Sequence, residues 1–421
     1  MNHYPPTKGI QTCSYNDSGE NLEAKVSEQP RRERAAGKEF VNHLMLRNGS
    51  DAKDHLKFNL LLGGIPLFLY NLFSMHKAGF TRIATVGNED TGRIHKLFCD
   101  YFNIDDFVFV PEGEPSDWSL SNTIVRGKRA VNPTEEDNVL FCPGDAPFVN
   151  IKELARNKYA ADYDFIVPFN TKELCGSFFP RNYHFSLIDD VGNKYLTKES
   201  NALLMNLAKI NKNRFGDELY DMAFGARKTY AIGHPQQKFF AELIFKSKGK
   251  FSLKRTAGTI SKIGAAGFFS QITRYALRQA FNIKENDKNV PTLKAESCAE
   301  LVEHALDVPG FKAKLYPTLD AAALMDMDSF EDVIFAQAIL QLAPSLVYPH
   351  YDELKAFADK IRNWGCNFTD NWHDFANEKF KKYDIRAEYV SPGVLSQEVF
   401  SKDRLLGQVE LIRKYRETTE F

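Results

Sequence analysis

Three places in the chain carry side chains suited to binding a phosphate ester and its accompanying cation. Asp145 follows an apolar run in VLFCPGDAPFV, and Lys57 opens the run KFNLLLGGIPL. Asp326 and Asp328 lie one residue apart in LMDMDSFEDV. Carboxylate oxygens are the ligands that Mg²⁺ takes from proteins alongside phosphate oxygens, and a lysine ammonium neutralises phosphate charge. These residue types together indicate binding of a metal–phosphate complex.

This chemistry requires elements that bring the three places together. Short β-branched and aromatic runs alternate with helical segments through the first half of the chain. Strands are predicted at 40–46, 82–86, 107–110, 139–142 and 165–168, and helices at 67–77, 92–102, 121–131 and 151–158. This alternation is typical of βαβ units in a mostly parallel sheet with helices on both faces. Ligands of such sheets bind at the carboxyl ends of the strands, where Asp145 is expected.

Each acidic motif also has an ordinary structural explanation. Asp145 would cap the helix predicted from residue 151, and Glu331 and Asp332 suit the first turn of a helix. Helix capping does not explain the two acids, Asp326 and Asp328, that precede this turn. We therefore prefer a metal site in which Asp145 and Asp328 share one cation between the two phosphates of a reacting bond.

The order of these motifs resembles that of the nucleotide-sugar pyrophosphorylase-like superfamily, which includes molybdenum-cofactor guanylyltransferase and cytidylyltransferases. Lys57 falls on the signature lysine of that family, and Gly63, Gly64, Pro66 and Leu67 fall on its closing Gly-Gly-x-Pro-Leu motif. PGDAPF resembles the strand end whose aspartate holds Mg²⁺, and residues 324–340 resemble a late acidic motif. The resemblance covers residues 40–340. It implies a Rossmann-like three-layer α/β/α sandwich of the GT-A type.

The loop in front of Lys57 departs from the family pattern. Family members carry two or three glycines and an arginine there, whereas this chain has Arg47, Asn48, Gly49, Ser50, Asp51, Ala52 and Lys53. The resemblance assigns nucleotide binding to Arg47, Asn48, Gly49 and Ser50. The structural alternative makes Lys57 a solvated loop lysine and the Gly-Gly pair a plain turn.

Weaker signals concern the nucleobase and the acceptor. Ser121 and Asn122 in WSLSNTIVRG lie where family members read the base or the ribose. Asn201 in KESNALLMN, together with Arg227 and Lys228 in GARKTY, resembles segments on the acceptor side. A helix cap or a surface charge is the ordinary explanation for each of these residues.

Composition argues against several other classes of protein. The 421 residues carry 54 basic and 55 acidic side chains, so no strongly basic footprint points to nucleic acid. Six scattered cysteines without a CxxC pair predict reduced, buried thiols in a cytoplasmic protein. The ten histidines show no metal-ligand spacing. No apolar run reaches the length of a membrane span, and the first residues do not resemble a secretory signal.

The expected organisation has three parts. Residues 1–38 are predicted to form a disordered leader, residues 39–340 a nucleotidyltransferase-like domain, and residues 341–421 a helical extension. A mainly helical insertion is expected at about 175–320. Within it, the basic and amphipathic segment 251–281 is interpreted as a packing helix, and contact with a membrane surface or an acidic partner is the alternative.

The resemblance implies Mg²⁺-dependent transfer of a nucleoside monophosphate from a nucleoside triphosphate to a phosphorylated acceptor, with release of pyrophosphate. Lys57 and Asp145 would serve catalysis, and CTP or GTP is favoured. Asn201, Arg227 and Lys228 would bind the acceptor. Two alternatives stay open: a glycosyltransferase of the same sheet topology that uses a nucleotide-sugar donor, and a catalytically inactive nucleotide-binding or scaffold protein.

Overall fold

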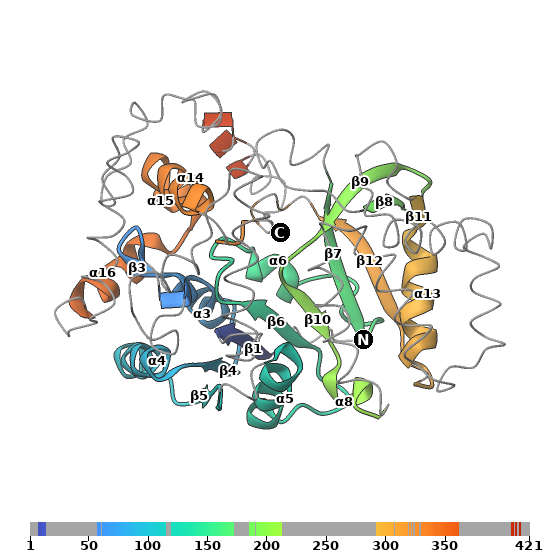
Figure 1. The fold of residues 1–421 in the computed structure, drawn as a ribbon, viewed down its shortest axis with the longest axis horizontal. Helices are drawn as coiled ribbons and strands as arrows, with labels where there is room; N and C mark the ends of the chain where they lie inside the picture. The colour runs from blue at the N-terminus through green and yellow to red at the C-terminus, as the bar shows by residue number, and fades with distance from the viewer. Residues whose placement is uncertain are drawn as a thin grey trace, which may run out of the picture.

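The central element of the fold is one ten-stranded sheet (Figure 1). The computed structural model describes residues 7–13, 57–59, 61–114, 119–171, 185–189, 191–212, 292–306, 308–318, 320, 322, 325–327, 330–361, 406–407, 409–410 and 412–413. Within these residues, nine strands follow one path across the sheet and a tenth pairs alongside it.

Four parallel strands form one half of the sheet, in the spatial order β5–β4–β1–β6. They are β1 (Lys8–Cys13), β4 (Arg82–Gly87), β5 (Phe107–Pro111) and β6 (Val139–Pro143). In β1, Ile10 lies opposite Ala84 of β4 and Phe141 of β6. Nearly every residue of β1 and β4 is buried, as expected of parallel strands with helices on both faces.

The other half of the sheet is arranged around β7 (Phe165–Thr171). One edge of β7 pairs in parallel with β12, and the other pairs antiparallel with β9 and β10. Because β10 also pairs with β6, it joins the two halves, and β8 and β11 extend the sheet beyond β9. The bounds are β8 (Phe185–Ile188), β9 (Lys194–Glu199), β10 (Leu203–Met205), β11 (Thr292–Lys294) and β12 (Ala313–Thr318).

Successive strand residues enter two separate cores, one on each face of the sheet. Ile83 and Leu140 belong to one core, and their neighbours Ala84 and Val139 belong to the other. The first core includes α3 (Leu67–Lys77), α4 (Glu89–Phe102) and α6 (Ile151–Ala155), and the second includes α5 (Leu120–Val131), α8 (Leu207–Ile210) and α13 (Ala295–Leu306). The predicted Rossmann-like three-layer sandwich is confirmed.

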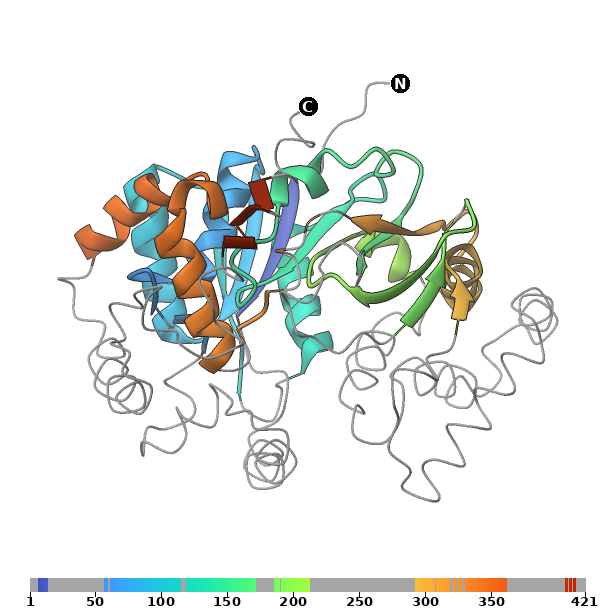
Figure 2. The ribbon, with the colours of Figure 1, turned by 90° about the horizontal axis from the view of Figure 1, so that it is seen from above.

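Helices from the C-terminal part of the chain join the first core. They are α14 (Phe330–Leu342), α15 (Pro344–Val347) and α16 (Tyr351–Ile361). Of these, the orange helix α16 packs against α3 and α4, on the blue and teal side of the molecule in both views (Figures 1 and 2). The Tyr348 hydroxyl donates to the Tyr70 carbonyl at 2.7 Å, and the ring centroids of Phe98 and Phe357 lie 5.6 Å apart. Among the described helices, none has the length and apolar character of a membrane span.

The predicted disordered leader is wrong for residues 8–13, because these residues form the central strand β1. The run KGIQTC contains a single large aliphatic residue, so its hydrophobic pattern does not reveal a strand. Its polar side chains are paired inside the protein instead. Gln11 donates through Nε2 to the Phe68 carbonyl at 2.6 Å and accepts from Thr85 at 3.2 Å. The strand predicted at 40–46 lies outside the described residues.

The expectation of a mainly helical insertion at about 175–320 is also wrong where the structure describes this segment. It contributes β8 to β12 to the sheet, although the predicted helix at 295–306 is confirmed as α13. Strands such as KYLTKE are short and polar, so their backbone pairing with β7 and β8 identifies them better than any apolar run. Residues 213–291 lie outside the described residues.

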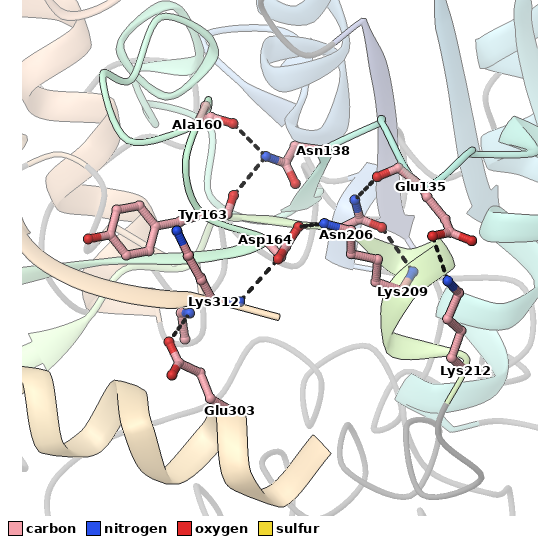
Figure 3. A network of polar contacts seen from close by, with 11 residues as sticks. Glu135, Asn138, Ala160, Tyr163, Asp164, Asn206, Lys209, Lys212, Glu303 and Lys312 are labelled. Atoms are coloured by element: carbon pink, nitrogen blue, oxygen red, sulfur yellow. Dashed lines mark hydrogen bonds and ion pairs between the residues drawn. The ribbon is translucent and has the colours of Figure 1, made fainter. Parts of the chain in front are cut away.

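A polar network ties together the loops at the amino ends of β6, β7 and β12 (Figure 3). Its centre is Asp164, a buried residue directly before β7. The Asp164 carboxylate accepts from Lys209 at 2.6 Å and from the Lys312 backbone N–H at 3.0 Å. Asn206 donates from its backbone to the Asp164 carbonyl and from its side chain to the Glu135 carbonyl, both at 2.6 Å. These bonds fix the strand register at this edge of the sheet.

Lys8, at the start of β1, anchors the central strand at the same edge. Its Nζ donates to Asp137 at 2.8 Å, and Asp137 also accepts from the backbone N–H and the hydroxyl of Thr134. Partial burial acts to raise the pKa of the Asp137 carboxyl, but the bonds from Lys8 and Thr134 outweigh it and hold the pKa below the usual 3.8. A lowered folded-state pKa means that this carboxylate stabilises the fold above its unfolded-state pKa and loses that effect in acid.

We therefore expect Asp137→Asn to lower the free energy of unfolding by about 1 kcal/mol at pH 7, since one partly exposed ion pair is lost. The difference from wild type should shrink as the pH falls below about 4. Urea unfolding at pH 7 and pH 3 measures it. Asp90→Asn removes an exposed ion pair with Arg93 and serves as the control. A pH-independent difference for Asp137→Asn would contradict the ionic explanation.

Candidate functional site

The carboxyl ends of the four parallel strands lie side by side and form the floor of the candidate site. The backbone N–H of Glu112, directly after β5, donates to the Gly87 carbonyl at the end of β4 at 2.9 Å. The N–H of Gly144, directly after β6, donates to Thr12 of β1, also at 2.9 Å. The strand ends therefore lie in the order Glu112, Gly87, Cys13 and Gly144.

Two glycines keep this floor closely packed. A Cβ atom added to Gly144 would lie 2.5 Å from Cys13 Sγ, and one added to Gly87 would lie 3.1 Å from the Cys13 carbonyl oxygen. Any side chain at Gly144 would therefore displace the end of β1 or the loop that carries Asp145. The glycine before Asp145 is explained by this close approach.

Helix α3 holds the loop that contains Asp145. Asn71 Nδ2 donates to the carbonyls of Pro143 and Ala146, both at 2.8 Å, so one buried amide brackets Gly144 and Asp145. The ring centroid of Phe148 lies 5.7 Å from that of Tyr70, which also belongs to α3. Asp145 itself is partly exposed at the end of β6. This placement at a strand end agrees with the sequence-based expectation.

A second acidic segment meets this loop. The backbone N–H of Met327 donates to the Asp145 carbonyl at 2.9 Å. Asp326, the residue before it, is 7% exposed. The structure thus brings the Asp326 segment to the Asp145 loop. Asp328, the predicted metal ligand, lies outside the described residues, so its role stays a prediction.

Asp320, which the sequence analysis did not single out, joins these two loops. One oxygen of its buried carboxylate accepts from the Asn150 N–H at 2.9 Å, and the other accepts from the Ala322 N–H at 3.1 Å. Its backbone carbonyl accepts from the Asn170 amide of β7. Asp320 therefore holds the end of the β6 loop against the segment that leads from β12 toward Asp326.

The electrostatics around Cys13 reveal a further acidic residue at this edge. Burial raises the pKa of the Cys13 thiol well above its usual range, and the negative charges of Asp145 and Glu112 raise it further. Cys13 therefore stays a neutral thiol, as predicted for buried cysteines. Glu112 is 8% exposed and was missed by the sequence analysis. Its position directly after a predicted strand, as for Asp145, is the signal that identifies it.

Lys57 begins a short helix, η1 (Lys57–Asn59), beside the Asp145 loop. A Cβ atom on Gly144 would lie 3.1 Å from the ring of Phe58. Asn59 is buried and accepts from Thr91 of α4 at 3.0 Å. The backbone of the predicted lysine segment therefore lies at the same edge as Asp145. The predicted nucleotide-binding residues of the preceding loop, Arg47, Asn48, Gly49 and Ser50, lie outside the described residues.

Ser121 and Asn122 lie in the first turn of α5, on the β5 side of the same edge. Ser119 is the N-cap of this helix, and its hydroxyl accepts from the Asn122 backbone N–H at 3.1 Å. The Ser121 hydroxyl lies 3.3 Å from the Ser119 hydroxyl. Helix capping accounts for Ser119, whereas the Asn122 side chain is exposed next to the floor.

Asn201 lies at the opposite side of the floor, between β9 and β10. Ser200 donates from its backbone to Pro168 of β7 at 2.9 Å, and Leu203 pairs with Phe141 of β6. Since β10 runs antiparallel to β6, the buried Asn201 lies level with the carboxyl end of β6. The other two predicted acceptor residues, Arg227 and Lys228, lie outside the described residues.

Within the described part of the chain, no group of three or more His, Cys, Asp or Glu side chains is placed to hold a metal ion. The acids at this edge come from separate segments, and Asp328 lies outside the described residues. Asp145 and the partner acids of residues 326–328 are nevertheless hard oxygen donors of the type that Mg²⁺ takes together with phosphate oxygens. The residue types fit that cation, and the two segments that carry them are bonded to each other.

Comparison with known proteins yields a distant structural likeness. No protein-family model matches the chain, and no curated protein matches it. A nucleotidyl transferase from Methanothermobacter thermautotroptrophicus is a similar solved structure, with 16% identity and a TM-score of 0.26. The similar region covers 39% of this chain and 62% of that one. At this level of similarity, the function has to be argued from the residues of the site.

The Asn71 amide offers a test of how the Asp145 loop is held. Asn71→Ala removes the amide donor from the buried Ala146 carbonyl and from the partly buried Pro143 carbonyl, so we expect the free energy of unfolding to fall by about 2–4 kcal/mol. Ser74→Ala, one turn further along α3, removes a single bond to Tyr348 and should cost about 1 kcal/mol. Urea denaturation of both variants measures the difference. Equal losses would show that the loop does not depend on Asn71.

Proposed function

We propose that this chain is a divalent-cation-dependent nucleotidyltransferase that binds a nucleoside triphosphate across the carboxyl ends of β5, β4, β1 and β6. The observation that carries the proposal is the bond from the Met327 N–H to the Asp145 carbonyl, 2.9 Å long. It brings acids from two distant segments to the edge of a parallel sheet, where ligands of such sheets bind.

Phosphate binding is assigned to the β6 end of the floor. Asp145, with Asp326 or Asp328, would hold one Mg²⁺, and Lys57 would neutralise charge on the β- and γ-phosphates. When bound, the cation would offset phosphate charge and draw electron density from the α-phosphorus. Asn71 and Asp320 act earlier, because they fix the two loops before any substrate arrives.

Base recognition is assigned to the β5 end. Three strand spacings separate β6 from β5, a span of about 14 Å that suits a nucleoside with its phosphate chain. Glu112 lies at this end, and a carboxylate accepts hydrogen bonds but donates none. It would therefore pair with the adjacent N–H groups of guanine or with the amino group of cytosine or adenine, so a base with an amino group is expected at this end. Ser121 and Asn122 flank the same end.

The proposed reaction is an in-line displacement at the α-phosphorus. An acceptor oxygen forms a bond to this phosphorus while the bond to the bridging oxygen breaks, and pyrophosphate leaves with that electron pair. The protein contributes positioning and charge neutralisation, which are the main sources of rate in such reactions. Asn201, which lies between β9 and β10, is proposed to bind a phosphorylated acceptor together with Arg227 and Lys228.

A second candidate is transfer from a nucleotide-sugar donor on the same floor. It is favoured by the loop at residues 47–53, in which Gly49 is the only glycine, because a triphosphate is usually held by several backbone N–H groups. The two candidates differ in the donor that binds. A nucleotidyltransferase binds the triphosphate more tightly in Mg²⁺ than the matching nucleotide sugar, and a glycosyltransferase shows the reverse order.

The Asp145 carboxylate tests the proposal directly. We expect wild type to bind GTP or CTP at least tenfold more tightly with Mg²⁺ than without it, and Asp145→Asn to lose this gain because one metal ligand is removed. Isothermal titration calorimetry with and without Mg²⁺ measures both affinities. Asp162→Asn, an exposed position in the loop before β7, is the matched control. A full Mg²⁺ gain in Asp145→Asn would exclude Asp145 as a ligand.

A further inference from the structure

The hairpin that follows Lys57 is held by the C-terminal helices. β2 (Leu61–Leu62) and β3 (Ile65–Pro66) are joined by Gly63 and Gly64, both with positive φ, 60° and 78°. The Gly63 N–H donates to Gln337 Oε1 of α14 at 2.6 Å, and the Gly63 carbonyl accepts from the Tyr351 hydroxyl at 3.3 Å. Both peptide groups of this glycine are therefore bonded to residues distant in the sequence.

The strands of this hairpin are too short to fix their own position. Each strand contains two residues, and among the described strands β2 and β3 pair only with each other, apart from the ten-stranded sheet. Two isolated strands of this length are not stable in water. The place of the hairpin, and of η1 before it, is therefore set by side chains from other elements. Tyr70 supplies one such bond, to the Leu62 carbonyl at 2.8 Å.

Helix α14 connects this hairpin to the acidic segment. It begins at Phe330, shortly after Met327, which is bonded to the Asp145 carbonyl. Gln337 lies about 10 Å along the helix from Phe330, at a rise of about 1.5 Å per residue. The Gln337 side chain is 9% exposed, so its bond to Gly63 is shielded from water. The same helix thus follows the acidic segment in the chain and contacts the hairpin that follows Lys57.

We propose that Gln337 is a positioning residue that sets the reach of Lys57 toward the phosphates of a nucleotide held at Asp145. The inference rests on the proposed function. The ammonium and the carboxylates must meet the same phosphate chain, and an error of about 1 Å in such placement is costly to binding and rate. The bond from Gly63 to Gln337 fixes this separation before the nucleotide binds.

The test compares Gln337→Met, which removes the acceptor oxygen at similar volume, with Gln337→Glu, which keeps an acceptor oxygen. Gln341→Met, one turn along α14 at an exposed position, is the control. Affinities for GTP and for GMP are measured in Mg²⁺. Because Lys57 is assigned to the β- and γ-phosphates, Gln337→Met should bind GTP about tenfold more weakly and GMP unchanged. Gln337→Glu and Gln341→Met should stay within about threefold of wild type.

A double-mutant cycle with Lys57→Ala shows whether Gln337 acts through the lysine. If it does, Lys57→Ala combined with Gln337→Met should bind GTP no more weakly than Lys57→Ala alone. If the losses of GTP affinity in Lys57→Ala and Gln337→Met multiply in the double variant, the positioning role is overturned and a purely structural one remains. Equal losses of affinity for GTP and GMP in Gln337→Met would have the same meaning. If wild type binds GTP and CTP no better than GMP and CMP, the proposed function itself fails, which is a different result.

Discussion

The hydrogen bond from the Met327 N–H to the Asp145 carbonyl is the contact on which the candidate site depends. The two loops that it joins follow β6 and β12, which are separated in the sheet by β10 and β7. The segment after β12 must therefore cross about 14 Å of sheet, three strand spacings, to reach the Asp145 loop. The Asp320 carboxylate braces this crossing, because it accepts backbone N–H groups from both sides. These bonds hold the two acidic loops against each other.

Bringing carboxylates together costs free energy, because like charges repel in a partly buried place. The protein offsets this cost with neutral donors, namely the Asn71 amide and the backbone N–H groups, and with a rigid opposite edge. There the Asp164 network (Figure 3) and the Lys8–Asp137 pair fix the strand register. The fold thus divides its polar residues. The amino edge is paired internally, and the carboxyl edge carries the acids Asp145, Glu112 and Asp326 among the described residues.

Sequence reasoning located Asp145 because an apolar strand runs directly into it, and it predicted the helix 67–77 with its observed bounds. It missed β1, since KGIQTC is buried through side-chain hydrogen bonds instead of apolar contacts. It also missed β8 to β10, whose identity as strands depends on pairing with distant partners. Glu112 follows a predicted strand, but its place beside the end of β4 depends on the strand order. Asp320 is recognisable only from the fold, in which it accepts backbone N–H groups from the β6 loop and from the segment after β12.

The central claim is that Asp145 and residues 326–328 hold one cation against the phosphates of a nucleotide. Crystals of the full chain with Mn²⁺ and a non-hydrolysable GTP or CTP analogue would test it by anomalous diffraction. We expect one manganese peak about 2.1–2.2 Å from an Asp145 carboxylate oxygen and from an oxygen of Asp326 or Asp328, with phosphate oxygens completing its coordination. A nucleotide bound with manganese on neither acidic segment, or a nucleotide on the opposite edge of the sheet, would contradict the account.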